Sequence, residues 1–378
     1  MSKSIAQFCA GFAPGDAIST EALNIRRVMR QCGYRSEIYS WPDFIHPESR
    51  GWCKPVSKFS PSSTDLLIYH FSISSPMTRH ALDFSGRKIM IYHNITPGHY
   101  FRRYDPKVAD QLDDGRKELQ SLSETFDLAL ADSEFNRKEL ESLNYRNTAV
   151  LPILFDPSQL SQNLDSSATE SASIRVNPRP QSAFRIPHSA IVSPDPELTT
   201  RFFVGRLAPN KKAEDLVTIF GLYQKFINPR SRLFWIGSWG SLSLYYTELR
   251  AMVRDLKLRD VCFTGYVPQS ALVDCYRHSD VLVSTSEHEG FCVPILESFY
   301  YGKPVIAYAA GAVPETVGEA GILFSEKDWM CFAEAIHRVV CDPELRGHLV
   351  AAGQTRLEHQ FSFSRVSQLL KSYITPLL

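Results

Sequence analysis

Several features that would assign the chain to a class at once are missing from the sequence. Charge of one sign is missing, because 41 Lys and Arg residues balance 41 Asp and Glu residues, and such a protein is not expected to bind nucleic acid. No apolar run approaches the roughly 18 residues that cross a bilayer, and the first residues do not form a signal peptide. We therefore expect a cytoplasmic protein, with peripheral attachment to the inner face of the membrane left open.

Metal and disulfide patterns are missing as well. The eight cysteines are scattered without a Cys-x-x-Cys pair, and no paired histidines stand at metal-ligand spacing, so reduced thiols are expected. The chain has no Asp-x-Asp triplet to hold a divalent cation on phosphates and no Gly-x-Gly-x-x-Gly dinucleotide fingerprint. We therefore expect neither a metal nor another cofactor.

What is present is a repeated alternation of two patterns. Short apolar runs typical of buried parallel strands alternate with stretches of helical period, which predicts an α/β fold. Strands are expected at residues 5–12, 65–70, 88–93, 128–131, 201–205, 233–236, 261–263, 281–284 and 304–308. Helices are expected near 19–33, 213–226, 242–256, 270–278, 293–301 and 365–373.

The chain of 378 residues is long enough for two domains of ordinary size. Residues 157–198 are rich in Ser and Pro and have little periodicity, so we interpret them as a linker enlarged by an insertion. We expect Rossmann-like domains at 1–156 and 199–357, followed at 358–378 by a helix that crosses back to the first domain. Ligands of such sheets bind at the carboxyl ends of the strands, so we expect the site in a deep cleft between the domains.

The most informative motif is a turn between a buried strand and a helix. Gly290 lies in the turn, and Pro294 stands where the first helical position is expected. The amides of Phe291, Cys292 and Val293 are then free to face the cleft as a site for anions and hydroxyls.

Two carboxylates frame this turn. Glu297 lies one turn inside the helix and leans toward its start, where the two hydroxyls of a ribose are a suitable partner. Glu289 lies on the loop and would meet whatever extends beyond the phosphates. The alternative is that Glu289 is merely solvated and Glu297 caps its own helix.

A second motif joins a strand to a helix through the segment 205–212. Arg206 and Lys211 stand at the carboxyl end of the strand, where two cations would neutralise a diphosphate and stabilise it as a leaving group. Without a metal, the phosphates need these side chains. A solvated basic turn is the competing interpretation.

The first half offers two weaker candidates. Gly15 follows the first strand, where it would let backbone amides approach a phosphate or sugar, although a plain strand-to-helix turn explains it equally well. His93 ends another strand and would face the same cleft as Glu289, but a lone histidine is more often structural. The aromatic and basic residues at 100–104 could contact an acceptor or a membrane surface.

Together these residues resemble the retaining glycosyltransferases of family 4, also called glycosyltransferase group 1, which have the two-domain GT-B fold. Glu289 and Glu297 resemble the family's Glu-x7-Glu motif, and Arg206 with Lys211 resembles its basic loop. The similarity extends to the Gly15 loop, His93 and the segments 131–136, 302–305 and 311–315. Cys292 and Ala213 depart from the family, which usually has Gly at both positions.

The resemblance implies a role for each site residue. The first domain would take the acceptor, and the second would take the nucleotide sugar. Donor diphosphate would be bound by Arg206 and Lys211, ribose by Glu297, and the base by backbone near Val267. Donor sugar would be bound by Glu289, Gly290 and the amides of Phe291, Cys292 and Val293. His93 would touch the sugar or the reacting centre, so Glu289 and His93 are the expected catalytic residues.

The implied reaction is metal-independent hexosyl transfer with retention of configuration. A UDP-sugar such as UDP-glucose is favoured as donor, with GDP-mannose possible, and the acceptor would be a saccharide or a lipid-linked saccharide in polysaccharide biosynthesis. A glycoside hydrolase is one alternative, although it needs two carboxylates that face each other across a glycosidic bond. A nucleotide-sugar epimerase or binding protein, which needs no acceptor, and a catalytically inactive scaffold are the others.

Overall fold

The computed structural model describes residues 2–158 and 199–378 and consists of two parallel sheets covered by helices. The first sheet has seven strands in the order β3-β2-β1-β4-β5-β6-β7, and the second has six in the order β10-β9-β8-β11-β12-β13. The fold is therefore α/β, as the alternating sequence pattern predicts. The expected linker at 157–198 lies almost wholly outside the described residues.

The first sheet and its helices come from the N-terminal part of the chain. Its core consists of the buried faces of the central strands, where nearly every residue of β4 and β5 is shielded from water. The strands are β1 Ser4–Cys9, β2 Arg35–Ser40, β3 Lys54–Pro55, β4 Leu66–Phe71, β5 Arg87–Tyr92, β6 Leu128–Ala131 and β7 Thr148–Val150, and the α-helices are α1 Ala17–Gln31, α2 Met77–Asp83, α3 Pro106–Ser121 and α4 Glu134–Ser142.

The second sheet follows the same alternation. Its strands are β8 Thr199–Val204, β9 Ser231–Ile236, β10 Val261–Gly265, β11 Val281–Ser284, β12 Val305–Tyr308 and β13 Ile322–Phe324. Its helices are α7 Ala213–Phe226, α8 Ser243–Asp255, α9 Gln269–His278, α10 Val293–Tyr300, α11 Val313–Val317, α12 Trp329–Cys341 and α13 Pro343–Phe361, and α14 Phe363–Ile374 follows.

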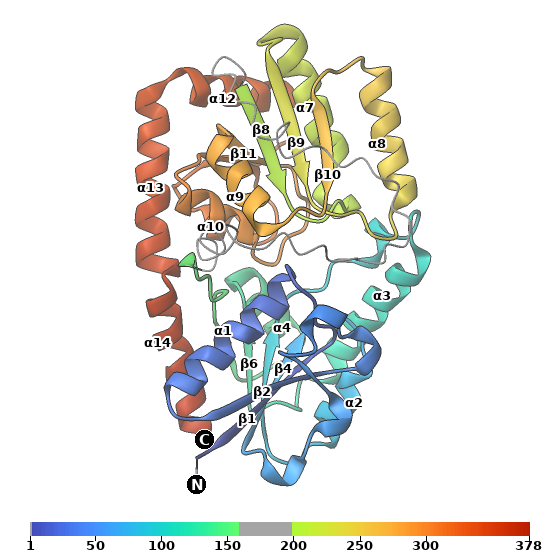
Figure 1. The fold of residues 1–378 in the computed structure, drawn as a ribbon, viewed down its shortest axis with the longest axis vertical. Coiled ribbons are helices and arrows are strands. Elements are labelled where there is room, and N and C mark those ends of the chain that lie inside the picture. The colour runs from blue at the N-terminus through green and yellow to red at the C-terminus, as the bar shows by residue number, and fades with distance from the viewer. Residues whose placement is uncertain (1, 159–198) are drawn as a thin grey trace, which may run out of the picture.

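The last two helices run along one side of both sheets (Figure 1). Val366, Leu370 and Ile374 of α14 are buried against Ile25 and Val28 of α1. The prediction that the C-terminal helix packs back on the first domain is therefore confirmed. The expected start of this crossing segment at residue 358 lies inside α13, because helix continues to Phe361 before the chain turns.

Several elements were not predicted from the sequence. Strand β2 buries Ser36 and Ser40 together with a single apolar residue, Ile38, so it lacks the apolar run by which the other strands were found. Helix α13 buries few residues on any single face, so its helical period is weak. The first strand ends at Cys9 rather than at residue 12. Within the described part of the chain, no helix has both the length and the apolar content required to span a membrane.

Candidate active site

In both sheets the sequential order of the strands reverses near the centre. Strand β1 lies between β2 and β4, and β8 lies between β9 and β11. The chain leaves the carboxyl ends of neighbouring strands in opposite directions at these points, which opens space for a ligand. The loops after β1, β8 and β11 carry the predicted residues Gly15, Arg206 and Lys211, and Glu289.

Lys211 and Glu289 are brought into direct contact. The Lys211 Nζ atom lies 2.5 Å from each carboxylate oxygen of Glu289. The Glu289 residue is only 6% exposed, while the Lys211 side chain keeps 21% of its surface in solvent. A shielded carboxylate thus faces a cation that solvent can still reach.

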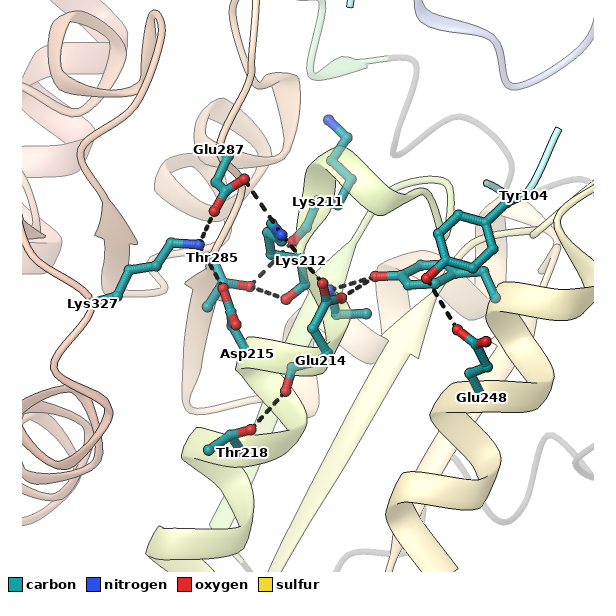
Figure 2. A network of polar contacts seen from close by, with 12 residues as sticks. Tyr104, Lys211, Lys212, Glu214, Asp215, Thr218, Glu248, Thr285, Glu287 and Lys327 are labelled. Atoms are coloured by element: carbon teal, nitrogen blue, oxygen red, sulfur yellow. Dashed lines mark hydrogen bonds and ion pairs between the residues drawn. The ribbon is translucent and has the colours of Figure 1, made fainter. Parts of the chain in front are cut away.

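The turn that carries Lys211 is fixed by the end of β11. The Thr285 hydroxyl approaches the carbonyl oxygens of Lys211 and Lys212 at 3.2 and 2.9 Å, and the Glu287 amide donates to the Asn210 carbonyl at 2.9 Å. Figure 2 shows the Lys211 side chain leaving this turn on the side away from Asp215. The backbone of Lys211 is therefore held by the end of β11, and its side chain extends from the turn to Glu289.

A network of charged side chains supports the same turn from behind (Figure 2). Lys327 binds the carboxylates of Asp215, at 2.7 Å, and Glu287. Lys212 lies 3.4 Å from Glu214 and 3.5 Å from Glu287. Sequence reasoning missed this network because Lys327 contacts residues that lie 40 and 112 positions away in the sequence.

The turn before α10 presents unpaired amides. Cys292 precedes the helix with a φ of 75° and has no side-chain cap. No group in the described chain accepts a hydrogen bond from the amides of Phe291, Cys292 or Val293. The helix begins at Val293, so the expectation that Pro294 occupies the first helical position is wrong by one residue: the left-handed Cys292 lets the helix start earlier.

Gly290 is the point where the second domain meets the first. A Cβ atom built on Gly290 would lie 2.6 Å from the Asn94 Cβ and 3.0 Å from the His93 carbonyl oxygen, so only glycine fits. The Asn136 amide donates to the Gly290 carbonyl at 3.2 Å. Asn94 in turn accepts from His288 Nε2 at 2.5 Å. The turn before α10 therefore rests on Asn94 and Asn136.

Glu297 lies within α10 as expected and is bound from one side. The Tyr276 hydroxyl donates to its Oε2 atom at 2.5 Å. Burial raises the pKa of Glu297, and the Tyr276 hydrogen bond opposes this shift. One carboxylate oxygen is thereby fixed.

Gly15, Arg206 and Val267 lie at the same junction of the two sheets. Gly15 has a φ of 72°, and a Cβ atom there would lie 3.6 Å from the ring of Tyr266, the neighbour of Val267. The Arg206 guanidinium is 6.0 Å from the ring centre of Phe101. Arg206 is exposed, yet desolvation by surrounding protein lowers the pKa of its guanidinium, with the Asp16 charge opposing the shift.

His93 does not present its ring to this junction. Its side chain is 2% exposed, and Nδ1 lies 3.0 Å from Asp132 Oδ2 and 3.4 Å from Glu21 Oε2. The other ring nitrogen, Nε2, lies 2.9 Å from Nδ1 of His70. The His93 atom that lies close to Gly290, in the turn before α10, is its carbonyl oxygen. The expected contact of the His93 ring with the sugar therefore stays a prediction.

One group of side chains in the described chain could share a cation. The ligand atoms of Glu21, His93 and Asp132 lie within 4.8 Å of one another. Sequence reasoning did not single out Glu21, because it lies on α1, far in sequence from the other two. Asp132 was noted only as part of the segment 131–136.

The loop at 100–104, considered as an acceptor or membrane contact, binds within the protein. Arg103 and Tyr104 both bind Glu248 of the second domain. Arg102 binds Asp110 and Asp113 of α3. These basic and aromatic groups are therefore engaged in joining the two domains and in bracing α3.

Comparison with known proteins finds matches that lie mainly in the second domain. Residues 189–356 match the family described as "Glycosyl transferases group 1". The D-inositol 3-phosphate glycosyltransferase of Acidothermus cellulolyticus is 38% identical over 160 residues, which are 39% of this chain and 34% of that protein. Human alpha-1,3/1,6-mannosyltransferase ALG2 is 29% identical over 136 residues, 35% of this chain and 33% of that protein. The matches span less than half the length of the first curated relatives.

Solved structures match over nearly the whole chain. Sucrose-phosphate synthase from Thermosynechococcus elongatus has a TM-score of 0.69 at 17% identity, with 99% of both chains covered. Anabaena HepE, solved in complex with UDP and glucose, has a TM-score of 0.71 at 16% identity, with 99% of this chain and 100% of that chain covered. The fold is therefore the GT-B fold.

Proposed function

We propose that this chain, whose residues 189–356 belong to the glycosyl transferases of group 1, transfers a hexose from a nucleotide sugar to a saccharide acceptor. The observation that carries the proposal is the contact of Lys211 with Glu289 beside the unpaired amides of residues 291–293. A sugar diphosphate offers groups that match, because phosphates bind cations and amides while sugar hydroxyls bind carboxylates.

The donor would be bound mainly by the second domain. Arg206 and Lys211 neutralise the diphosphate, while the free oxygen of Glu297 accepts hydrogen bonds from ribose hydroxyls. The backbone near Val267 contacts the base. Glu289 binds the sugar hydroxyls once the Lys211 ammonium turns toward the phosphates. A UDP-hexose is the favoured donor, which the UDP and glucose bound to HepE support.

The reaction would proceed with retention, as in family 4, and without a metal. The bond from the anomeric carbon to the phosphate oxygen breaks, and a bond to the acceptor oxygen forms on the same face of the sugar. The departing phosphate takes the acceptor's proton. The protein contributes orientation and charge, since Lys211 and Arg206 neutralise the phosphate as negative charge grows on it.

For the acceptor we propose a chemical class, and for the reaction a cellular location. A saccharide or lipid-linked saccharide would bind on the side of the first domain. Reaction in the cytoplasm, with such a lipid reached at the inner membrane surface, is consistent with a role in polysaccharide or glycoconjugate synthesis.

The hydrolase alternative is disfavoured by the contacts of the two glutamates. Glu289 is bound to Lys211, and Glu297 is bound to Tyr276. A hydrolase would need both carboxyl groups to face one glycosidic bond as acid and as base or nucleophile. An epimerase needs no acceptor, so turnover that depends on an acceptor distinguishes the proposed transferase from an epimerase.

The test is a transfer assay with UDP-glucose and GDP-mannose, each with and without a panel of saccharide and lipid-linked acceptors and with EDTA. We expect acceptor-dependent release of nucleoside diphosphate, an axial product linkage in the proton NMR spectrum, and no effect of EDTA. Glu289→Ala should abolish transfer, while Glu334→Ala, on the exposed face of α12, should not. Donor loss without any acceptor product, or full activity of Glu289→Ala, would overturn the proposal.

A further inference from the structure

A chain of hydrogen bonds in the first domain determines where the protons lie. Gln7 Nε2 donates to the Ala22 carbonyl at 3.1 Å and to the Ser36 hydroxyl at 3.4 Å. The other amide atom, Gln7 Oε1, can only accept, so His70 Nε2 at 2.9 Å carries a hydrogen. A neutral His70 then accepts at Nδ1, and His93 Nε2 is the donor at 2.9 Å.

The second nitrogen of His93 also carries a hydrogen. His93 Nδ1 faces Asp132 Oδ2 at 3.0 Å and Glu21 Oε2 at 3.4 Å, and a carboxylate can only accept. With hydrogens on both nitrogens, His93 is an imidazolium. The positive charge belongs on His93 rather than on His70 because only His93 contacts carboxylates. Although burial alone would disfavour the charge, chiefly the charge and hydrogen bond of Asp132 raise the pKa of His93 to about 9.

The charges of this cluster balance if Glu21 keeps its proton. Burial raises the pKa of Glu21 to about 8, as does the charge of Asp132, and neither oxygen of Glu21 has a well-aligned hydrogen bond within the described residues. The cluster is then one imidazolium, one carboxylate and one neutral acid. The titratable groups that face it are Cys9 on β1, Asp16 and Glu21 at α1, His70 on β4 and Asp132 after β6.

The His93–Asp132 pair joins the ends of β5 and β6, which support the turn before α10. This turn is called the donor turn below. His93 follows β5 and precedes Asn94, whose φ of 71° is strained for a residue with a side chain. Asn94 binds His288. The pair therefore fixes the backbone from which Asn94 reaches the second domain.

On the other side, Asp132 follows β6 and leads into α4. The first amides of α4, those of Glu134 and Phe135, donate to the Glu315 carboxylate of the second domain at 2.6 and 3.1 Å. Asn136 of the same helix binds the Gly290 carbonyl. All of these contacts connect the first domain to the donor side.

We propose that the buried His93–Asp132 ion pair, with the neutral Glu21 beside it, is a positioning device that holds Asn94 and the start of α4 against the donor turn. This proposal rests on the proposed function in one respect, because it assumes that the donor turn binds a donor sugar. His93 and Asp132 act through Asn94 and Asn136 rather than by touching the donor. When the imidazolium loses its proton, the two strand ends are no longer tied by charge.

The first test is the protonation of His93 in the full-length protein, which requires no activity. With 15N-labelled histidine, the ring signals lost in His93→Gln identify His93, and we expect both nitrogens to be protonated at pH 7. In Glu21→Gln and Asp132→Asn the midpoint of this titration should fall. A neutral His93 at pH 7, or a metal ion retained stoichiometrically and lost in Glu21→Gln, would overturn the proposal.

The second test is kinetic and uses Asp127→Asn as the matched control. Asp127 is exposed and stands at the opposite end of β6, where it binds the Lys88 amide. We expect Asp132→Asn to lower kcat by about tenfold to a hundredfold, because a small displacement of a catalytic site has this effect. The alkaline limb of the pH profile of kcat should also move to lower pH. A folded Asp132→Asn with an unchanged limb and unchanged kcat contradicts the proposal.

If Asp132→Asn does not fold, Glu21→Gln replaces it: the alkaline limb of the pH profile of kcat should move to lower pH, and an unchanged limb contradicts the proposal. Absence of transfer by the wild type would count against the proposed function only, since the NMR test would still report on the ion pair.

Discussion

The two domains use charge at their strand ends in opposite ways. In the second domain, Lys211 and Glu289 meet where solvent still reaches the cation, and the neighbouring amides are unpaired. In the first domain, Glu21, His93 and Asp132 are shielded almost completely. Toward the turn before α10, the first domain presents the neutral side chains of Asn94 and Asn136. One domain offers charge to a ligand, and the other buries charge to hold its own loops.

The largest expected effect comes from removing the exposed cation. Lys211→Ala leaves Glu289 shielded and without its partner, so we expect kcat/KM to fall by about 10²- to 10³-fold, the loss typical of one group that stabilises the transition state. The control is Lys225→Ala on the exposed end of α7. Equal activity of the two variants in the transfer assay would contradict the claim that the second domain uses the charge of Lys211 to bind its ligand.

The next effect tests whether the domains must meet at Gly290. Gly290→Ala places a methyl group 2.6 Å from the Asn94 Cβ, so we expect the contact to open and turnover to fall by about tenfold to a hundredfold. Gly347→Ala on α13 meets nothing within 4 Å and serves as control. If Gly290→Ala retains full turnover, close contact between the domains is not required.

A smaller effect concerns stability and pH. The pKa of His93 is raised from 6.5 to about 9, so the native state keeps a proton that the unfolded chain has lost. The free energy of unfolding should therefore fall by on the order of 3 kcal/mol as the pH rises from about 6.5 to about 9. Glu21, whose pKa is raised from 4.5 to about 8, acts in the same direction at lower pH.

Urea unfolding at a series of pH values checks this dependence. The fall should be present in the wild type and in Asp127→Asn and should be much smaller in Asp132→Asn. Parallel curves for all three proteins would mean that the buried cluster does not titrate as described.

The smallest effect is expected at Cys292. Its φ of 75° is costly for any residue with a Cβ atom, so Cys292→Gly should gain up to about 1 kcal/mol of stability. Cys292→Ala removes the thiol without relieving the backbone and should gain nothing. Thermal unfolding of the two variants separates strain from side-chain packing, and equal melting temperatures would show that the strain is not relieved.

The contrast also explains what the sequence could predict. The second-domain motifs are local: Arg206 and Lys211 stand on one loop, Glu289 and Glu297 stand on the turn before α10 and on α10 itself, and α7 has the predicted bounds. The first-domain cluster gathers side chains from separate elements, and no spacing in the sequence links Glu21 to Asp132. The direct contact of Lys211 with Glu289 was also not predicted, because it depends on how two loops are joined in space.

The central claim, that Lys211 beside Glu289 binds the donor diphosphate, is tested most directly by calorimetric titration with UDP and with GDP. The account predicts that the wild type and Lys225→Ala bind one of these nucleotides equally well and that Lys211→Ala binds it at least about tenfold more weakly, a difference of about 1.4 kcal/mol. Equal affinity of all three proteins, or no binding of either nucleotide by the wild type, would contradict it.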